Sequence, residues 1–129
     1  MTLDSSALLA ILFSEAGHLD LVDRILEADH VRVGAPTLVE TTLVLAGRRS
    51  SLPAAETVGA LVKELGATVV PFGEREWLNA VDAFQRFGRG RHAAGLNFGD
   101  CLAYGTAAAA NDTLLFVGND FAQTDIPSA

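Results

Sequence analysis

Apolar residues along the chain follow two patterns, short apolar runs and longer stretches in which apolar residues recur every three or four positions. The short runs predict strands over residues 1–3, 31–34, 67–70 and 113–117, the third of them buried. The longer stretches predict helices over residues 7–13, 18–28, 36–47, 53–65, 74–87 and 97–111. Because strands and helices alternate, we expect parallel strand pairing through right-handed crossovers and hence a layered α/β domain.

The helix over residues 74–87 is amphipathic, with Trp77, Val81 and Phe84 on one face. Large aromatic side chains at helical spacing are usually buried, so we expect Trp77, Phe84 and Phe87 to contribute to the core rather than to stack on bases. Cys101 is the only cysteine and is expected to be a packed small residue.

Composition indicates a folded single domain over residues 1–129. Half of the residues are hydrophobic and 19% are charged, which excludes a disordered chain. No apolar run reaches the roughly 18 residues that a membrane-spanning helix needs. A lone cysteine forms no internal disulfide, and no Lys or Arg precedes Arg24 as a secretion signal would require, so a cytoplasmic location is expected.

The formal net charge is −7, yet basic residues are concentrated locally. Arg89, Arg91 and His92 lie in a glycine-interleaved stretch, and arginine is well suited to bind phosphate groups. A merely solvated basic loop, or one paired with nearby carboxylates, is an equally good interpretation.

Four acidic residues stand apart from the other twelve. Asp4 follows the first predicted strand and Asp120 follows the last, and the carboxyl ends of parallel strands form the crevice in which ligands bind. Glu40 and Asp100 each lie near a helix start. Glu40 shares a stripe with Leu43 and Val44, and Asp100 shares one with Ala103 and Tyr104, so both stripes are expected to face the core.

Each of these acids also has a structural interpretation. Thr37-x-x-Glu40 matches a capping box and Asn97-x-x-Asp100 is a looser relative of one, while Asp4 can be an N-cap and Asp120 a turn residue. Capping explains one such residue easily but four converging ones poorly. Two ionised carboxylates about 4 Å apart repel by roughly 4 kcal/mol. If the four acids converge, a bound divalent cation removes this repulsion. Because all of the candidate ligands are oxygens, a hard cation such as Mg²⁺ or Mn²⁺ is favoured.

The acidic motifs resemble a known family. The spacing of Asp4-Ser5-Ser6, Glu40 in TLVE, Asp100 in LNFGDCLAYG and Asp120 in LLFVGNDFAQTDI closely resembles the PIN-domain ribonuclease toxins called VapC, of the VapBC toxin-antitoxin systems. The resemblance covers essentially the whole chain and is most specific over residues 87–103. It implies a PIN-like three-layer domain, in which helices flank a central parallel β-sheet, and a Mg²⁺- or Mn²⁺-dependent endoribonuclease that cleaves a tRNA or an rRNA loop.

The resemblance also implies roles for individual residues. The catalytic, metal-binding quartet would be Asp4, Glu40, Asp100 and Asp120. A metal-activated water would attack the phosphodiester and leave a 5′-phosphate and a 3′-hydroxyl. Supporting residues that orient these carboxylates would be Ser6, Asn119, Thr124 and Asp125. RNA phosphates would be contacted by Arg89, Arg91 and His92.

The expected partners are RNA, a second copy of the chain and a small VapB-like antitoxin, with DNA reached only indirectly through the antitoxin. Two other functions stay open. One is a catalytically silent module whose acidic pocket docks a basic peptide. The other is a metal-dependent phosphatase of another α/β fold, which is weakened because Ser6 stands where haloacid-dehalogenase-like enzymes need a second Asp. Response-regulator receivers need a lysine after a late strand, and the only lysine, Lys63, lies within a predicted helix.

Overall fold

The computed structural model describes residues 1–129 and contains one four-stranded, fully parallel sheet. The strand order is β3-β2-β1-β4. Thr2 of β1 is paired with Arg32 of β2 on one side and with Leu114 of β4 on the other. The strands are β1 (Thr2–Leu3), β2 (Arg32–Gly34), β3 (Thr68–Val70) and β4 (Leu114–Leu115).

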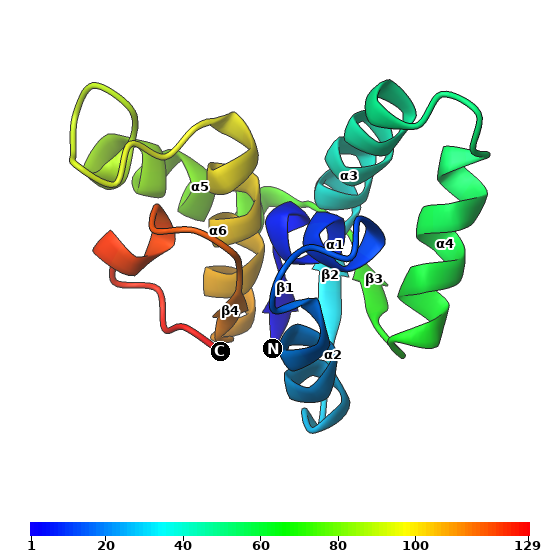
Figure 1. Cartoon of the computed structure of the whole chain (residues 1–129). Coiled ribbons are helices and arrows are strands. Elements are labelled where there is room, and N and C mark those ends of the chain that lie inside the picture. Colours follow the sequence, from blue (N-terminus) through cyan, green and yellow to red (C-terminus); the bar gives the residue numbers. More distant parts are fainter.

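Six α-helices and one short 3-10 helix, η1, connect and flank the strands (Figure 1). The helices are α1 (Ser5–Leu12), α2 (His18–Leu26), α3 (Ala35–Arg48), α4 (Ala54–Glu64), α5 (Glu74–Phe87), α6 (Phe98–Ala110) and η1 (Phe121–Gln123). This order confirms the layered α/β fold expected from the sequence. None of these helices has the length and apolar character needed to cross a membrane.

The sheet separates two hydrophobic cores. The first core joins α1 to α4 with the sheet and includes Leu3, Leu8 and Leu45. The second core joins α5, α6 and the C-terminal segment, and it includes Leu114. Leu114 and Leu115 belong to opposite cores because successive strand residues point to opposite faces of the sheet. Figure 1 shows the corresponding layers, with α5 and α6 on one side of the strands and α3 and α4 on the other.

The strand order reverses between β1 and β4. From β1 the chain continues outward to β2 and β3, and it then crosses back to place β4 on the other side of β1. In parallel sheets such a reversal opens a crevice at the carboxyl ends of the two strands, because their connections leave in different directions. Asp4 directly follows β1, and the segment that carries Asp120 follows β4. The fold therefore brings the two ends of the chain to one potential site.

Two sequence expectations about the strands are wrong. Residues 67–70 do not form a buried strand, because β3 is the edge of the sheet and Val69 is 49% exposed. An edge strand is flanked by another strand on one side only, so its side chains are less enclosed than those of a central strand. The last strand is also shorter than residues 113–117, since the chain turns away after Leu115.

The buried face of α5 also differs from the expectation. Trp77 and Phe84 are 55% and 41% exposed and Val81 is exposed as well, whereas Phe87 is half-buried and packs against the second core as expected. Alanines take the core positions because α5 packs against a glycine of α6. A Cβ at Gly105 would lie 2.5 Å from the carbonyl oxygen of Glu76. At that separation only small side chains fit between the helices.

The close contact of α5 and α6 leads to a stability prediction. We expect Gly105→Ala to lower the free energy of unfolding by about 1–3 kcal/mol, because the added methyl group forces the two helices apart. The matched control is Gly59→Ala in α4, where an added Cβ meets nothing within 4 Å, and it should raise stability by about 0.5–1 kcal/mol. Urea unfolding measures both. Equal effects of the two substitutions would contradict the packing argument.

Candidate metal-binding active site

Asp4 is the most buried acid of the molecule, with 3% of its surface exposed. It is the N-cap of α1, and its Oδ2 accepts hydrogen bonds from the backbone N–H of Ser6 (2.9 Å) and from Ser6 Oγ (2.5 Å). Its Oδ1 is buried without any hydrogen-bond partner. Burial raises the pKa of Asp4, the bonds from Ser6 oppose that rise, and the charge of Glu40 adds to it.

Ser6 also connects Asp4 to the segment after β4. Its Oγ accepts a hydrogen bond from the backbone N–H of Val117 at 2.9 Å while donating to Asp4. One hydroxyl thus links the carboxyl ends of the two strands between which the sheet order reverses. The contact gives Ser6 the geometry for orienting Asp4, in addition to its place in the first turn of α1.

Glu40 reaches the site from α3, but not as expected. It is the sixth residue of α3 and lies beyond the first turn, so the Thr37-x-x-Glu40 capping box does not form. The stripe through Leu43 and Val44 does not face the core either, since Leu43 is 67% exposed. The Glu40 carboxylate instead lies against Gly99 at the start of α6. A Cβ at Gly99 would be 2.6 Å from Glu40 Oε2 and closer still to Oε1.

Asp100 combines a capping role with a position in the site. Its Oδ2 accepts a hydrogen bond from the Asn97 N–H at 2.7 Å, and Asn97 Oδ1 accepts one from the Asp100 N–H at 3.1 Å, which completes a capping box. Ala103 and Tyr104, which lie on the same face of α6 as Asp100, are buried, as predicted. Burial raises the pKa of Asp100, the bond from Asn97 opposes this, and the charges of Asp4 and Asp120 raise it further.

Asp120 is exposed and lies at the start of η1, after the turn at Gly118, whose φ is +111°. Its negative charge is close enough to raise the pKa of Asp100. Asp120 is therefore the solvent-facing member of the quartet, opposite the buried Asp4.

The four acids form a chain of electrostatic neighbours. Asp4 is coupled to Glu40 and to Asp100, and Asp100 is coupled to Asp120. None of the four takes part in an ion pair. No group of three or more His, Cys, Asp or Glu side chains is arranged so that together they could hold a metal ion.

These residues nevertheless fit a hard divalent cation. Mg²⁺ binds through one or two carboxylates and keeps several of its waters, so it requires no closed cage of protein ligands. The unpartnered Oδ1 of Asp4 is a buried acceptor for which such a cation or its water is the natural partner. An all-oxygen donor set with repelling charges favours Mg²⁺ or Mn²⁺ over zinc.

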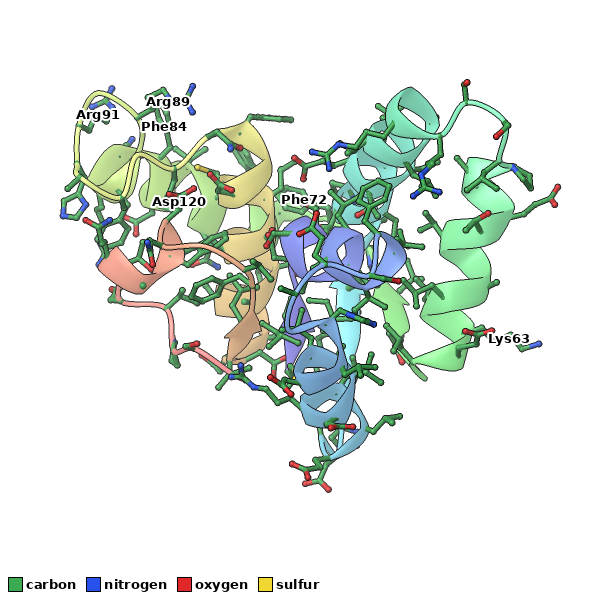
Figure 2. All side chains as sticks on the ribbon, in the orientation of Figure 1. Lys63, Phe72, Phe84, Arg89, Arg91 and Asp120 are labelled. Carbon is green, nitrogen blue, oxygen red and sulfur yellow. The ribbon has the colours of Figure 1, made fainter.

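The basic loop lies beside the acids. Figure 2 shows Arg89 and Arg91 on a loop on the same side of the view as Asp120, whereas Lys63 lies on α4 at the opposite side. Arg89 is close enough to Asp100 to lower its pKa, although burial outweighs this effect. The Arg91 guanidinium carbon is 5.2 Å from the centre of the Phe84 ring. His92 accepts a hydrogen bond at Nδ1 from the Ala94 N–H, which leaves Nε2 as the donor of the neutral ring.

The residues expected to support Asp120 have other contacts. Thr124 Oγ1 donates to the carbonyl oxygen of Phe121 at 2.8 Å, and the Asn119 side chain is exposed without a hydrogen bond. Asp125 does not bond to Asp120. It accepts a hydrogen bond from Tyr104 Oη at 2.6 Å and one from Arg86, and these two bonds lower its pKa.

Tyr104 and Arg86 were not identified from the sequence. No local spacing signal relates either of them to Asp125, because these contacts join positions distant in the chain. The prediction for Cys101 is confirmed. It is 5% exposed, and burial together with the neighbouring Asp100 raises the pKa of its thiol to about 11.

Sequence comparisons relate the chain to one family. A family model described as PIN domain matches residues 1–127. VapC ribonuclease Mb2004c of Mycobacterium bovis is 42% identical over 128 residues, which cover 98% of this chain and 91% of that protein. Ribonuclease VapC28 of Mycobacterium tuberculosis is 38% identical over 130 residues, covering 100% of this chain and 97% of that protein.

Solved structures share the fold. VapC20 of Mycobacterium tuberculosis, described as a sarcin-ricin loop cleaving toxin, has a TM-score of 0.76 at 17% identity and covers 99% of this chain and 97% of its own. A toxin-antitoxin complex from Klebsiella pneumoniae has a TM-score of 0.72 at 12% identity, covering 99% and 95%. VapBC2 of Rickettsia felis, bound to a DNA fragment from its promoter, has a TM-score of 0.68 at 11% identity, covering 98% and 94%.

The raised pKa of Asp4 gives a pH-dependence prediction for the protein in chelator. The folded state binds a proton at Asp4 more tightly than the unfolded chain does, so this group costs stability as pH rises above its unfolded pKa of about 4. The stability of Asp4→Asn relative to the wild type should therefore increase as pH rises from about 4 to 7. The change is about 1.4 kcal/mol for every tenfold difference in proton affinity. Urea unfolding at several pH values measures it, and a pH-independent difference would contradict the desolvation of Asp4.

Proposed function

Because the chain belongs to the PIN-domain family and is a VapC-type ribonuclease, we propose that it is a toxin that cleaves structured RNA with a bound Mg²⁺ or Mn²⁺. The supporting observation is the convergence of Asp4, Glu40, Asp100 and Asp120 where the strand order reverses, with one buried carboxylate oxygen left unpartnered. Acids that served only as helix caps would not be expected to lie close enough at one crevice to raise each other's pKa values.

The chain's own residues have distinct parts in this proposal. Asp4 and Asp100 would hold the cation, and Glu40 and Asp120 would complete the acidic pocket around it. Ser6 fixes the orientation of Asp4 through its hydroxyl, and Asn97 fixes that of Asp100 through its backbone N–H. When bound, the cation lowers the pKa of a coordinated water and neutralises charge on the phosphate. No histidine is therefore needed as a general base.

The basic loop and the acidic pocket together favour an RNA substrate. Arg89 and Arg91 present exposed guanidinium groups next to the acids, where they can bind phosphates flanking the scissile bond. Such contacts position a backbone without reading its sequence. A tRNA or an rRNA loop, exposed and single-stranded at its tip, is the substrate class we propose.

An acidic pocket with exposed apolar surroundings also suits a regulatory partner. We expect a VapB-like antitoxin to occupy the site with a basic segment, which would satisfy the same carboxylates that bind the cation. Any contact with DNA would come through that antitoxin. Toxin-antitoxin complexes among the solved structures of the same fold support this expectation.

RNA cleavage is the direct test of the proposal. We expect the wild type to cut RNA only with Mg²⁺ or Mn²⁺ present. Asp4→Asn and Asp100→Asn should each reduce cleavage by about 10²–10³-fold, because each removes a charge that binds the cation. Sequencing of RNA ends after controlled expression identifies the target and should find 5′-phosphate and 3′-hydroxyl termini.

The control for charge alone is Asp23→Asn, since Asp23 is an exposed acid on α2 outside the site. This variant should cleave like the wild type. Cleavage that survives in the folded Asp4 and Asp100 variants would refute the metal-dependent mechanism. A wild type that binds a basic partner but leaves RNA intact would favour the silent binding module.

An exposed apolar surface runs beside the active site and supports the proposed homodimer. Two cavities of about 830 and 430 Å³ share Phe72, Phe98 and Leu102 and form one continuous surface, which we call the apolar face. Phe98 is 80% exposed and Leu43 is 67% exposed. Soluble monomers rarely expose a contiguous apolar surface of this kind, and a two-fold symmetric dimer would bury it against its own copy.

Dimer formation is tested by a charge on the apolar face. We expect the wild type to be a dimer in solution and Leu43→Lys to shift it towards monomer, because an unpaired charge in an apolar interface costs several kcal/mol. The matched control is Leu19→Lys on α2, where Leu19 is 65% exposed outside the face. Sedimentation analysis at micromolar concentration distinguishes them. A monomeric wild type would contradict the dimer.

A further inference from the structure

Asp120 lies on a loop that leaves β4 and returns to it. We call residues 116–127 the Asp120 loop. At its end the Leu114 N–H donates to the carbonyl oxygen of Pro127 at 2.8 Å, and the Ala129 N–H donates to the carbonyl oxygen of Leu114 at 3.0 Å. Both ends of the loop are thus attached to one strand. The position of Asp120 in between depends on what holds the rest of the loop.

Apolar contacts hold the loop against the second core. Phe121 is 3% exposed and Ile126 is 9% exposed, and both pack into the core formed with α5 and α6. The rings of Phe116 and Phe121 lie 5.1 Å apart. These contacts keep the loop attached, but hydrophobic packing is not directional. Packing alone therefore does not specify where along the crevice Asp120 lies.

Asp125 supplies the directional side-chain contacts of the loop after Asp120, whereas before Asp120 the Val117 N–H donates to Ser6 Oγ at 2.9 Å. Tyr104 Oη of α6 donates to Asp125 Oδ1 at 2.6 Å, and the Arg86 guanidinium of α5 pairs with Asp125 Oδ2. One carboxylate is thereby bonded to two different helices. Hydrogen bonds to a charged group are short and depend on angle, so this double contact fixes the loop laterally.

The helix partners of Asp125 are themselves held. The Arg86 guanidinium carbon lies 4.5 Å above the centre of the Phe87 ring, and the Tyr104 ring lies 6.2 Å from the same ring. Tyr104 follows Asp100 by one turn on α6, so the two side chains lie on the same helix face. A contact from Tyr104 to the Asp120 loop therefore links the two acids Asp100 and Asp120 through a rigid element.

Resting on the proposed function, we propose that Tyr104 and Arg86 are positioning residues: by holding Asp125 they set Asp120 relative to Asp100, and so determine how tightly the acidic pocket binds its divalent cation. Neither residue touches the cation or the RNA in this role. Their contribution is the geometry of the loop between Asp120 and its C-terminal end, where the remaining contacts to the second core are apolar.

The test is a titration of the protein with Mn²⁺ in the absence of RNA. The electron paramagnetic resonance signal of the unbound ion gives the Mn²⁺ dissociation constant. Tyr104→Phe removes the hydroxyl and keeps the packed ring, and Arg86→Gln removes the charge from a partly exposed position. Each should raise the Mn²⁺ dissociation constant about tenfold. RNA cleavage should recover most of its rate at saturating Mn²⁺, because the catalytic carboxylates are unchanged.

The matched control is Asp82→Asn. Asp82 pairs with Arg86 at 3.0 Å and its side chain is 54% exposed, as is that of Asp125, but it lies on α5 and does not contact the loop. Loss of this pair should leave Mn²⁺ affinity unchanged. The comparison separates the loop contact from a general effect of disturbing Arg86.

A double substitution separates positioning from stability. In an Asp120→Asn background, Tyr104→Phe should cause no further loss of Mn²⁺ affinity, because the residue acts through Asp120. A merely destabilising role would weaken binding in both backgrounds. Arg86→Gln gives the same comparison should Tyr104→Phe not fold.

Two results overturn the inference. Wild-type Mn²⁺ affinity in folded Tyr104→Phe and Arg86→Gln refutes it while leaving the proposed nuclease in place. Absence of Mn²⁺ binding and of metal-dependent RNA cleavage in the wild type refutes the proposed function, and this inference with it.

Discussion

The cost of burying Asp4 governs the organisation of the active site. A carboxylate with 3% exposure and one unpartnered oxygen is stable as an anion only if a positive charge approaches it, and otherwise it favours the protonated, neutral form. The fold places no arginine or lysine against it. The negative charge of Glu40 instead raises its pKa further, and the charge of Asp4 in turn raises the pKa of Asp100. In the proposed function, a divalent cation would supply the positive charge that the chain itself does not place beside Asp4.

The same acids stabilise the ends of the helices that carry them. Asp4 caps α1 and Asp100 completes a capping box at the start of α6. A carboxylate near a helix N-terminus is favoured by the partial positive charge of the unpaired N–H groups there. Capping and cation binding are therefore compatible uses of one side chain. The capping bonds occupy one oxygen of each residue in a defined direction and hold the carboxylate in place.

Much of the fold and part of the site could be predicted from the sequence. Asp4, Asp100 and Asp120 could be selected as candidate site residues because strand ends and helix starts have local signals. The orientation of Glu40 could not be predicted, because the buried face of α3 contains Thr37, Thr41 and Leu45. Thr41 Oγ1 bonds to the carbonyl oxygen of Thr37 at 2.8 Å and so satisfies its polar group inside the core. A pattern that counts threonine as polar therefore selects the wrong face.

The same limit applies to α5, where bulky apolar residues were expected inside and alanines occupy the core instead. The separation between two helices depends on the residues of both, and Gly105 of α6 brings them too close for Trp77 or Phe84. Contacts such as Tyr104 with Asp125 join distant positions and leave no periodic signal. Patterns within one element predict that element well, but they do not predict its distance from its neighbour.

The contact between Glu40 and Gly99 couples the two positions. Gly99 lies in a helix with ordinary dihedral angles, so its absent side chain matters for space and not for backbone freedom. Any larger residue there would displace the Glu40 carboxylate from the start of α6. A larger residue at position 99 therefore requires the end of the Glu40 side chain to move, so the effects of substitutions at the two positions depend on each other.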